Sequence, residues 1–413
     1  MARADTPATR PAIAGSLVAF LAFGMYAGCW AAMFPVFRDH AGASAGQLGL
    51  ALLASSAGSA PAMLVTGPLL DRFGPRVVGV SAIALGVATF ATAFAGSVPA
   101  LVVAFLLVGF TGGAMDIAMN GAVAHVEAQT RALMNIAHAT FSIGAATGGA
   151  LTGLARDAGW TSAAITGTLA ALLALVVLPN RSGASAWAPA SVAGDAVAPA
   201  APPSSRPMFT PWLVALGLLV ALSFVVEATA FSWAAIHVEN TFGASAGVAG
   251  VAVALYFTGS VVGRVSAHLW GHRATARTLV VGSGLLILAA ASVVATSPAV
   301  ALAIVALFAL GLGTATVAPT LYSVAGASAS GRRGAALATV AMLAYLGNLA
   351  GPALAGGIAD AASLRASFGA MAAVGALLAI GAALALRRTG GAGLDPAVGN
   401  VPDTLGAGIE HPN

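Results

Sequence analysis

Residues 67–76 read GPLLDRFGPR and stand between two long apolar segments. The stretch brings one acid, two arginines and two glycines into a chain that is 59% hydrophobic and only 7% charged. A soluble protein normally carries about a quarter charged residues. We therefore expect a polytopic helical membrane protein, with this loop at one membrane face.

The remaining composition excludes several function classes. The net charge is +4 and all seventeen basic residues are arginines, which fall singly or in pairs between apolar spans. We interpret them as topology signals and expect no nucleic-acid partner. Cys29 is the only cysteine, and no P-loop, zinc-protease or nucleophile-elbow motif occurs. We expect no metal, no cofactor and no catalytic residue, so the chain is not predicted to be an enzyme.

The hydropathy pattern predicts an all-α membrane protein with twelve transmembrane helices, because twelve apolar stretches reach the roughly 20 residues needed to cross a bilayer. The predicted spans are 13–37, 47–66, 77–95, 98–126, 133–155, 161–178, 211–237, 246–265, 279–296, 299–324, 334–359 and 366–386.

Two halves of the chain resemble each other. A shift of 203 residues superposes one set of small residues and an acid on another, namely Gly144, Gly148, Gly153 and Asp157 on Gly347, Gly351, Gly356 and Asp360. We expect two pseudo-symmetric six-helix bundles, residues 1–179 and 211–388, whose glycines permit close helix approach. A linker rich in Ala, Pro and Ser, residues 180–210, would join them, and residues 389–413 would form a disordered tail. Duplicated bundles hold solute sites near the midplane.

The arginines also predict the orientation. Fourteen of the seventeen fall on the side shared by both termini, and only Arg38, Arg156 and Arg365 fall on the other. Because cytoplasmic loops are enriched in arginine, both termini are expected in the cytoplasm of a bacterial-type inner membrane, with the chain in contact with lipid.

The spacing G-x-x-x-D-R-x-G-x-R at Gly67, Asp71, Arg72, Gly74 and Arg76 resembles the signature of the major facilitator superfamily between its second and third helices. The likeness covers the whole chain, although the second copy is degenerate, with Ala267 in place of the acid. Other stretches resemble the rhizopine-transporter-like (MosC-like) branch, distantly similar to fucose permeases; they include residues 116–120, 138–142 and 345–352. The resemblance implies the major facilitator fold and a small-solute permease.

In that superfamily the loop at residues 67–76 is a gating latch. The resemblance implies that Asp71 pairs with arginine and faces the N-terminal end of the eleventh span near Gly334, where the helix dipole favours an anion. Glu127 and Arg131 at the end of the fourth span are candidates for the same network. The alternative is that these charges only set topology.

Ionisable residues inside spans are the candidates for proton coupling. Asp116, Asn120 and Glu127 share one stripe of the fourth span at about 100° per residue, and the fifth span presents His138 and Ser142 at similar depth. We predict a polar cluster with Asp116 and His138 as proton carriers, since intramembrane ionisable groups usually face a cavity or a partner. The alternative is a static hydrogen-bond network between the two helices.

Glu227 is the acid of the seventh span, and no arginine in the sequence is an obvious partner for it. We predict a role in proton or substrate binding, with helix packing as the alternative. Aromatic and polar side chains of the spans supply further candidates for substrate binding: Tyr26, Trp30, Asn120, Ser142, Trp233, Tyr256 and Asn348.

Together these features predict a monomeric secondary transporter that moves a small polar or amphipathic organic solute by alternating access, coupled to protons. Import and export both stay open. An efflux antiporter for drugs or secondary metabolites is one alternative, although Gly148 is followed by Gly149 rather than by the proline typical of that group's fifth helix. A solute receptor that does not transport is the alternative from another class.

Overall fold

The computed structural model describes residues 9–127, 133–182, 209–270, 273–328 and 332–388, and it places them almost entirely in helices. The first half contains α1 (Thr9–His40), α2 (Ala45–Phe73), α3 (Arg76–Ala91), η1 (Thr92–Phe94), α4 (Val98–Glu127), α5 (Met134–Asp157), α6 (Ser162–Leu175) and α7 (Val177–Ser182). The second half contains α8 (Pro211–Phe242), α9 (Ala246–Trp270), α10 (Ala276–Thr296), α11 (Val300–Thr314), α12 (Val317–Ser328), α13 (Arg333–Ala361), α14 (Leu364–Ala385) and η4 (Leu386–Arg388).

Short polar residues start several of these helices. The hydroxyl of Ser44 accepts from the backbone N–H of Gln47, whose side chain accepts in return from the backbone of Ser44, a capping box that starts α2. Thr161 and Thr210 cap α6 and α8 by the same kind of bond to the third helical residue. Gly243 ends α8 in the left-handed conformation, with φ of 63°.

The predicted membrane spans match the helices closely. Ten helices of the described residues are long and apolar enough to cross a membrane, counting α6 with α7 and α11 with α12, and the bent helix α2 makes an eleventh. The remaining predicted span corresponds to α5, whose 24 residues are long enough to cross 30 Å of hydrocarbon. The glycines, threonines and His138 of α5 lower its hydropathy. Such residues are tolerated there because α5 packs against protein on two sides, along α1 and α9.

Prolines mark the breaks in two spans. Helix α2 bends by 44° between Ala62 and Leu64, directly after Pro61. The tenth predicted span is interrupted between α11 and α12, just before Pro319. Helix α13 runs through Pro352 without a break.

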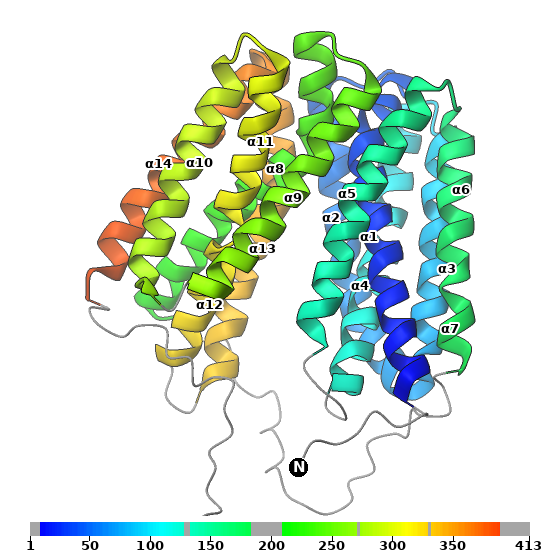
Figure 1. Cartoon of the computed structure of the whole chain (residues 1–413), viewed down its shortest axis with the longest axis horizontal. Coiled ribbons are helices and arrows are strands. Elements are labelled where there is room, and N and C mark those ends of the chain that lie inside the picture. Colours follow the sequence, from blue (N-terminus) through cyan, green and yellow to red (C-terminus); the bar gives the residue numbers. More distant parts are fainter. Residues whose placement is uncertain (1–8, 128–132, 183–208, 271–272, 329–331, 389–413) are drawn as a thin grey trace, which may run out of the picture.

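Figure 1 shows the two halves side by side, with their helices close together at one end and diverging toward the other. Helix α1 begins and η4 ends at the diverging end, which we call the terminal face. We call the converging end the opposite face. It carries the start of α2 at Ser44, the start of α9 at Ser245, and the ends of α5 and α13 at Asp157 and Asp360.

Glycines allow the tightest helix pairs within each half. A β-carbon on Gly28 of α1 would lie 1.9 Å from the carbonyl oxygen of Ala145, and one on Gly144 would lie 2.3 Å from that of Leu21. In the second half, Gly347 of α13 stands in the same relation to α8. The close approach expected from the repeated glycines is therefore present in both halves.

Helix pairs also join the halves to each other. Helix α5 packs along α9, α2 packs along α13, and α1 contacts α8. At the opposite face the contacts are between backbones: a β-carbon on Gly250 would lie 2.5 Å from the carbonyl oxygen of Gly149, and one on Gly356 would lie 2.5 Å from that of Ala45. The α2–α13 contact reaches deeper, where the Tyr345 hydroxyl donates to the carbonyl of Ser56.

Candidate functional site

A cavity of about 330 Å³ lies between the two halves and is lined by six helices, three from each half. Its volume is at the lower end of the range typical of small-molecule sites. The lining residues are Phe23, Tyr26, Ala27 and Trp30 of α1, Leu52, Ser55 and Ser56 of α2, Phe141 and Ser142 of α5, Glu227, Ala228, Phe231 and Ser232 of α8, Tyr256, Phe257, Ser260 and Arg264 of α9, and Asn348 and Pro352 of α13.

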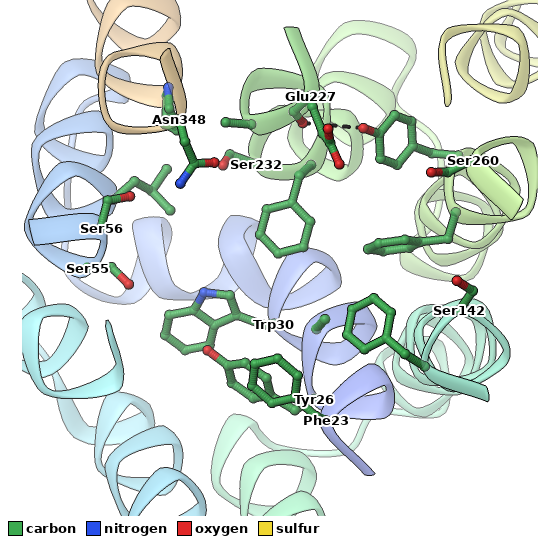
Figure 2. A pocket seen from close by; sticks show the side chains of 18 of the residues that line it. Phe23, Tyr26, Trp30, Ser55, Ser56, Ser142, Glu227, Ser232, Ser260 and Asn348 are labelled. Atoms are coloured by element: carbon green, nitrogen blue, oxygen red, sulfur yellow. Dashed lines mark hydrogen bonds between the residues drawn. The ribbon is translucent and has the colours of Figure 1, made fainter. Parts of the chain in front are cut away.

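One wall of the cavity is aromatic. Phe23, Tyr26 and Trp30 follow one another at helical spacing on α1, with ring centroids 5.5 Å and 5.9 Å apart in stacked arrangement. Across the cavity, Phe231 and Phe257 meet edge to face at 6.0 Å. Figure 2 shows the α1 aromatics on the side facing Glu227 and Asn348. Such a lining favours a solute with an apolar body.

The facing wall carries the polar groups. Glu227 is half-buried near the middle of α8, and the hydroxyl of Tyr256 donates to its backbone carbonyl at 3.4 Å. Figure 2 shows Ser232 and Asn348 beside Glu227, whereas Ser142 and Ser260 lie on another side of the cavity. Six of the predicted site residues thus share one cavity: Tyr26, Trp30, Ser142, Glu227, Tyr256 and Asn348.

Arg264 also lines this cavity, which the sequence did not lead us to expect. We had counted it among the fourteen topology arginines, at the end of the predicted span 246–265, and had named no arginine as a partner for Glu227. Helix α9 continues beyond it to Trp270, so Arg264 lies inside the helix and lines the cavity together with Glu227. The sequence missed this placement because an arginine at the end of a predicted span was interpreted as a topology signal.

The predicted polar cluster of α4 and α5 is divided in the structure. The side-chain amide of Asn120 donates to the carboxylate of Asp116 at 3.0 Å, one helical turn away, and both are half-buried. His138 is exposed and packs edge-on against Phe20 of α1 at 5.2 Å. Among the described residues, no hydrogen bond joins Asp116 to His138, and neither lines the cavity described above.

Trp233 lies away from the cavity. It is fully buried, and its indole N–H donates to the carbonyl of Pro352 at 3.2 Å, which ties α8 to α13. Trp233 is six residues after Glu227, about 240° around α8, on the side where it bonds Pro352 of α13, whereas Phe231, four residues after Glu227, returns to the cavity.

At the opposite face, Asp360 joins the end of α13 to the start of α2. Its carboxylate accepts from the hydroxyl of Ser44 at 2.6 Å and from the backbone N–H groups of Ala45 and Gly46 at 2.9 Å and 2.8 Å. The free N–H groups and the dipole of a helix start favour such an anion. These bonds cross from one half of the protein to the other.

Asp157 makes the matching contact on the other side of the interface. Its carboxylate accepts from the hydroxyl of Ser245 at 2.8 Å, at the start of α9. Asp157 and Asp360 are two of the residues that superpose under the 203-residue shift, so the two contacts are pseudo-symmetric copies. We call the pairs Asp360–Ser44 and Asp157–Ser245 the carboxylate clamps.

An ion pair supports the clamps. Arg156 and Glu239 form two parallel bonds of 2.6 Å and 2.9 Å between α5 and α8, with side chains 12% and 17% exposed. Arg156 also donates to the carbonyl of Ala32 at 2.8 Å. This arginine, expected on the side away from the termini, therefore joins the halves there.

Among the residues that the structure describes, no hydrogen bond or ion pair joins the latch residues to the other half. Asp71, Arg72 and Arg76 are exposed, and the Arg72 guanidinium lies 5.1 Å from the ring of Phe73. Gly74, with φ of 63°, ends α2. A β-carbon on Gly67 or on Gly334 would meet no atom within 4 Å.

Glu127 accepts from the backbone N–H of Leu133 at 3.1 Å, within its own half. Arg131 lies outside the described residues. The predicted network of Asp71 with Glu127 and Arg131 therefore remains a prediction.

The fold and the cavity define a class of protein: a multi-pass membrane transporter of small solutes. The sequence matches the Major Facilitator Superfamily over residues 15–237 and 216–400, so the chain belongs to that family. Members of the family are transporters rather than enzymes.

Its relatives agree with this assignment. The chain is 28% identical over 375 residues to an uncharacterised MFS-type transporter of Yersinia pestis, which covers 88% of this chain and 93% of that one. It is 24% identical over 351 residues to the membrane protein MosC of Rhizobium meliloti, which covers 84% of each.

Two solved structures share the fold. The nucleoside transporter NupG superposes with a TM-score of 0.74 at 11% identity, covering 92% of this chain and all of that one. A bacterial homologue of the lysosomal transporter Spinster, in an inward-facing conformation, superposes with a TM-score of 0.69 at 15% identity, covering 93% of this chain and 98% of that one.

Proposed function

We propose that this protein is a secondary active transporter that moves a small polar or amphipathic organic solute by alternating access. The observation that carries the proposal is the central cavity, to which both halves contribute three helices, together with interhalf contacts at the opposite face. A site shared by two halves changes its accessibility when the halves rock against each other.

The proposed moving bundles are residues 1–179 and 211–388, joined by the linker at 180–210. We place the terminal face in the cytoplasm, because fourteen of the seventeen arginines were assigned to that side. The structure then corresponds to a state closed to the outside by the carboxylate clamps. The cavity is complete within one chain, which supports a monomer as the working unit.

In the reverse state, the latch at Asp71 would close the cytoplasmic side. In this structure the clamps are formed, whereas the described latch residues make no hydrogen bond or ion pair with the other half. This supports the proposal, because alternating access requires that only one set of interhalf contacts form at a time.

Proton coupling is assigned to Glu227, with Asp116 and His138 as further candidates. Glu227 is the cavity's carboxylate, so a proton and a solute bound there influence each other directly. Replacement by glutamine should preserve solute exchange while abolishing accumulation driven by a pH gradient. Gradient-driven accumulation at the wild-type level in E227Q would exclude Glu227 as the coupling residue.

The proposed function is tested by a flux screen with purified protein in proteoliposomes, with and without a pH gradient. A transporter gives flux of at least one solute above protein-free vesicles, and a dependence on the gradient identifies coupling. The aromatic wall keeps efflux of amphipathic compounds as a second candidate function, which outward flux of such compounds would select. Tight solute binding without flux would instead indicate a receptor.

A further inference from the structure

Arg264 is a positive charge inside a membrane span that has no partner in the described part of the protein. Other arginines of the spans and their ends are satisfied: Arg156 by Glu239, Arg365 by the carbonyl of Ala295, and Arg277 by that of Ala383. The ion pairs within 4 Å among the described residues are Arg38–Asp39 and Arg156–Glu239. Arg264 and Glu227 therefore share a cavity without pairing.

An unpaired guanidinium that lines a solute cavity calls for an anion from outside the chain. Its planar set of donors matches a carboxylate in two parallel bonds. We propose that Arg264 is the substrate-anchoring residue of this transporter, and that the substrate is a small organic monocarboxylate with an apolar or ring-shaped body.

The charge balance of the cavity limits the anion to one negative charge. The lining contains one cation, Arg264, and one acid, Glu227. A monocarboxylate on Arg264 leaves the cavity neutral when Glu227 holds a proton or faces a cationic group of the solute. A dianion such as a phosphate ester would leave uncompensated negative charge in the membrane interior, which is costly.

The rest of the lining fits the body of such a solute. Phe23, Phe141, Phe231 and Phe257 offer apolar ring surfaces, and serine hydroxyls with Asn348 offer hydrogen bonds between them. The cavity, at about 330 Å³, has room for a carboxylate with a six-membered ring. The other titratable groups that face Arg264 are Tyr256, which lines the cavity, and His138, which lies beyond it.

The inference rests on the proposed transport function but is tested by binding. Isothermal titration of the purified full chain would compare benzoate, phenylacetate and 3-phenylpropionate with their uncharged carboxamides. We expect at least one acid to bind about tenfold or more tightly than its amide, which corresponds to about 1.4 kcal/mol from the charge-assisted pair. R264Q should abolish this preference, and R264K should retain part of it.

The control is R277Q, because Arg277 is also an exposed arginine of the second half but does not line the cavity. It should leave the preference unchanged, and thermal unfolding would verify that both glutamine variants fold. Equal binding of acid and amide, an acid preference that survives in R264Q, or no binding of any acid would each overturn the proposal.

Flux measurements separate this inference from the proposed function. Flux of neutral solutes that is unaffected by R264Q would support the proposed transport function and contradict a carboxylate as the substrate. Carboxylate binding that depends on Arg264 but never leads to flux would support Arg264 as the carboxylate-binding residue and contradict the proposed transport function.

Discussion

Removing the carboxylate clamps should open the opposite face. The perturbation is Asp360→Ala, alone and combined with Asp157→Ala. Asp360 accepts three hydrogen bonds at the start of α2, and Asp157 accepts from Ser245 at the start of α9. All of these bonds cross between the halves, so they stabilise only the state in which the opposite face is closed.

The expected magnitude follows from the exposure of the clamps. Shielded hydrogen bonds to a charged group contribute about 1.5–3 kcal/mol each. Asp360 is exposed, however, so water screens it, and the loss should resemble that of a helix cap, about 1 kcal/mol per clamp. Both substitutions together then amount to about 2 kcal/mol, which shifts the conformational equilibrium roughly thirtyfold toward the state open at the opposite face.

Distances between spin labels at the opposite face would measure the shift. Ser97 and Ala299 are exposed and lie in equivalent loops of the two halves, before α4 and α11. Labels at these positions, in a Cys29→Ala background, should show a longer distance whose population grows in the single variant and again in the double variant.

Asp39→Ala is the matched control. Asp39 is an acid on the same face whose described ion pair is with its neighbour Arg38, so its removal should leave the label distances unchanged. Asp360→Asn, which keeps an acceptor but loses the charge, should have a smaller effect than alanine. Identical distance distributions in the wild type and the double variant would refute the role of the clamps.

Three further predictions concern stability and helix spacing, each measured by thermal unfolding. Arg156→Met should cost about 2 kcal/mol because it leaves the largely buried Glu239 unpaired, whereas changing both to Met should cost less; an equal loss would contradict this. Trp233→Phe should cost about 1–3 kcal/mol by leaving the buried Pro352 carbonyl without its donor, and an unchanged midpoint would contradict it. Gly250→Ala should cost about 1–3 kcal/mol because its β-carbon meets the α5 backbone, whereas Gly282→Ala on α10, where no atom lies within 4 Å, should be neutral or stabilising. Equal midpoints in the two alanine variants would contradict the tight α5–α9 contact.

Much of the fold could be predicted from the sequence, because hydropathy and helix length are local properties of the chain. The spans, the glycine-mediated pairs and the repeat of the two halves all follow from such patterns. The repeat also contained Asp157 and Asp360, although no sequence pattern indicated that they would meet Ser245 and Ser44.

The site was predicted only where a side chain is conspicuous. Glu227, Tyr26 and Trp30 stand out in an apolar span, whereas Ser55 and Ser56 resemble ordinary small packing residues. Arg264 was missed because it stands at the end of the predicted span 246–265 and was counted as a topology signal rather than as a lining residue. Trp233 was included because its residue type fits a binding site, and its burial against α13 does not follow from the sequence of α8.

A reversible lock across the opposite face tests the account most directly. Ser44→Cys and Asp360→Cys, in the Cys29→Ala background, place two thiols where a hydroxyl and a carboxylate now lie 2.6 Å apart. A short, reducible crosslinker between them should abolish the flux of whichever solute the wild type carries in proteoliposomes, and reduction should restore it. Undiminished flux through protein that mass spectrometry shows to be fully crosslinked would contradict alternating access through the central cavity.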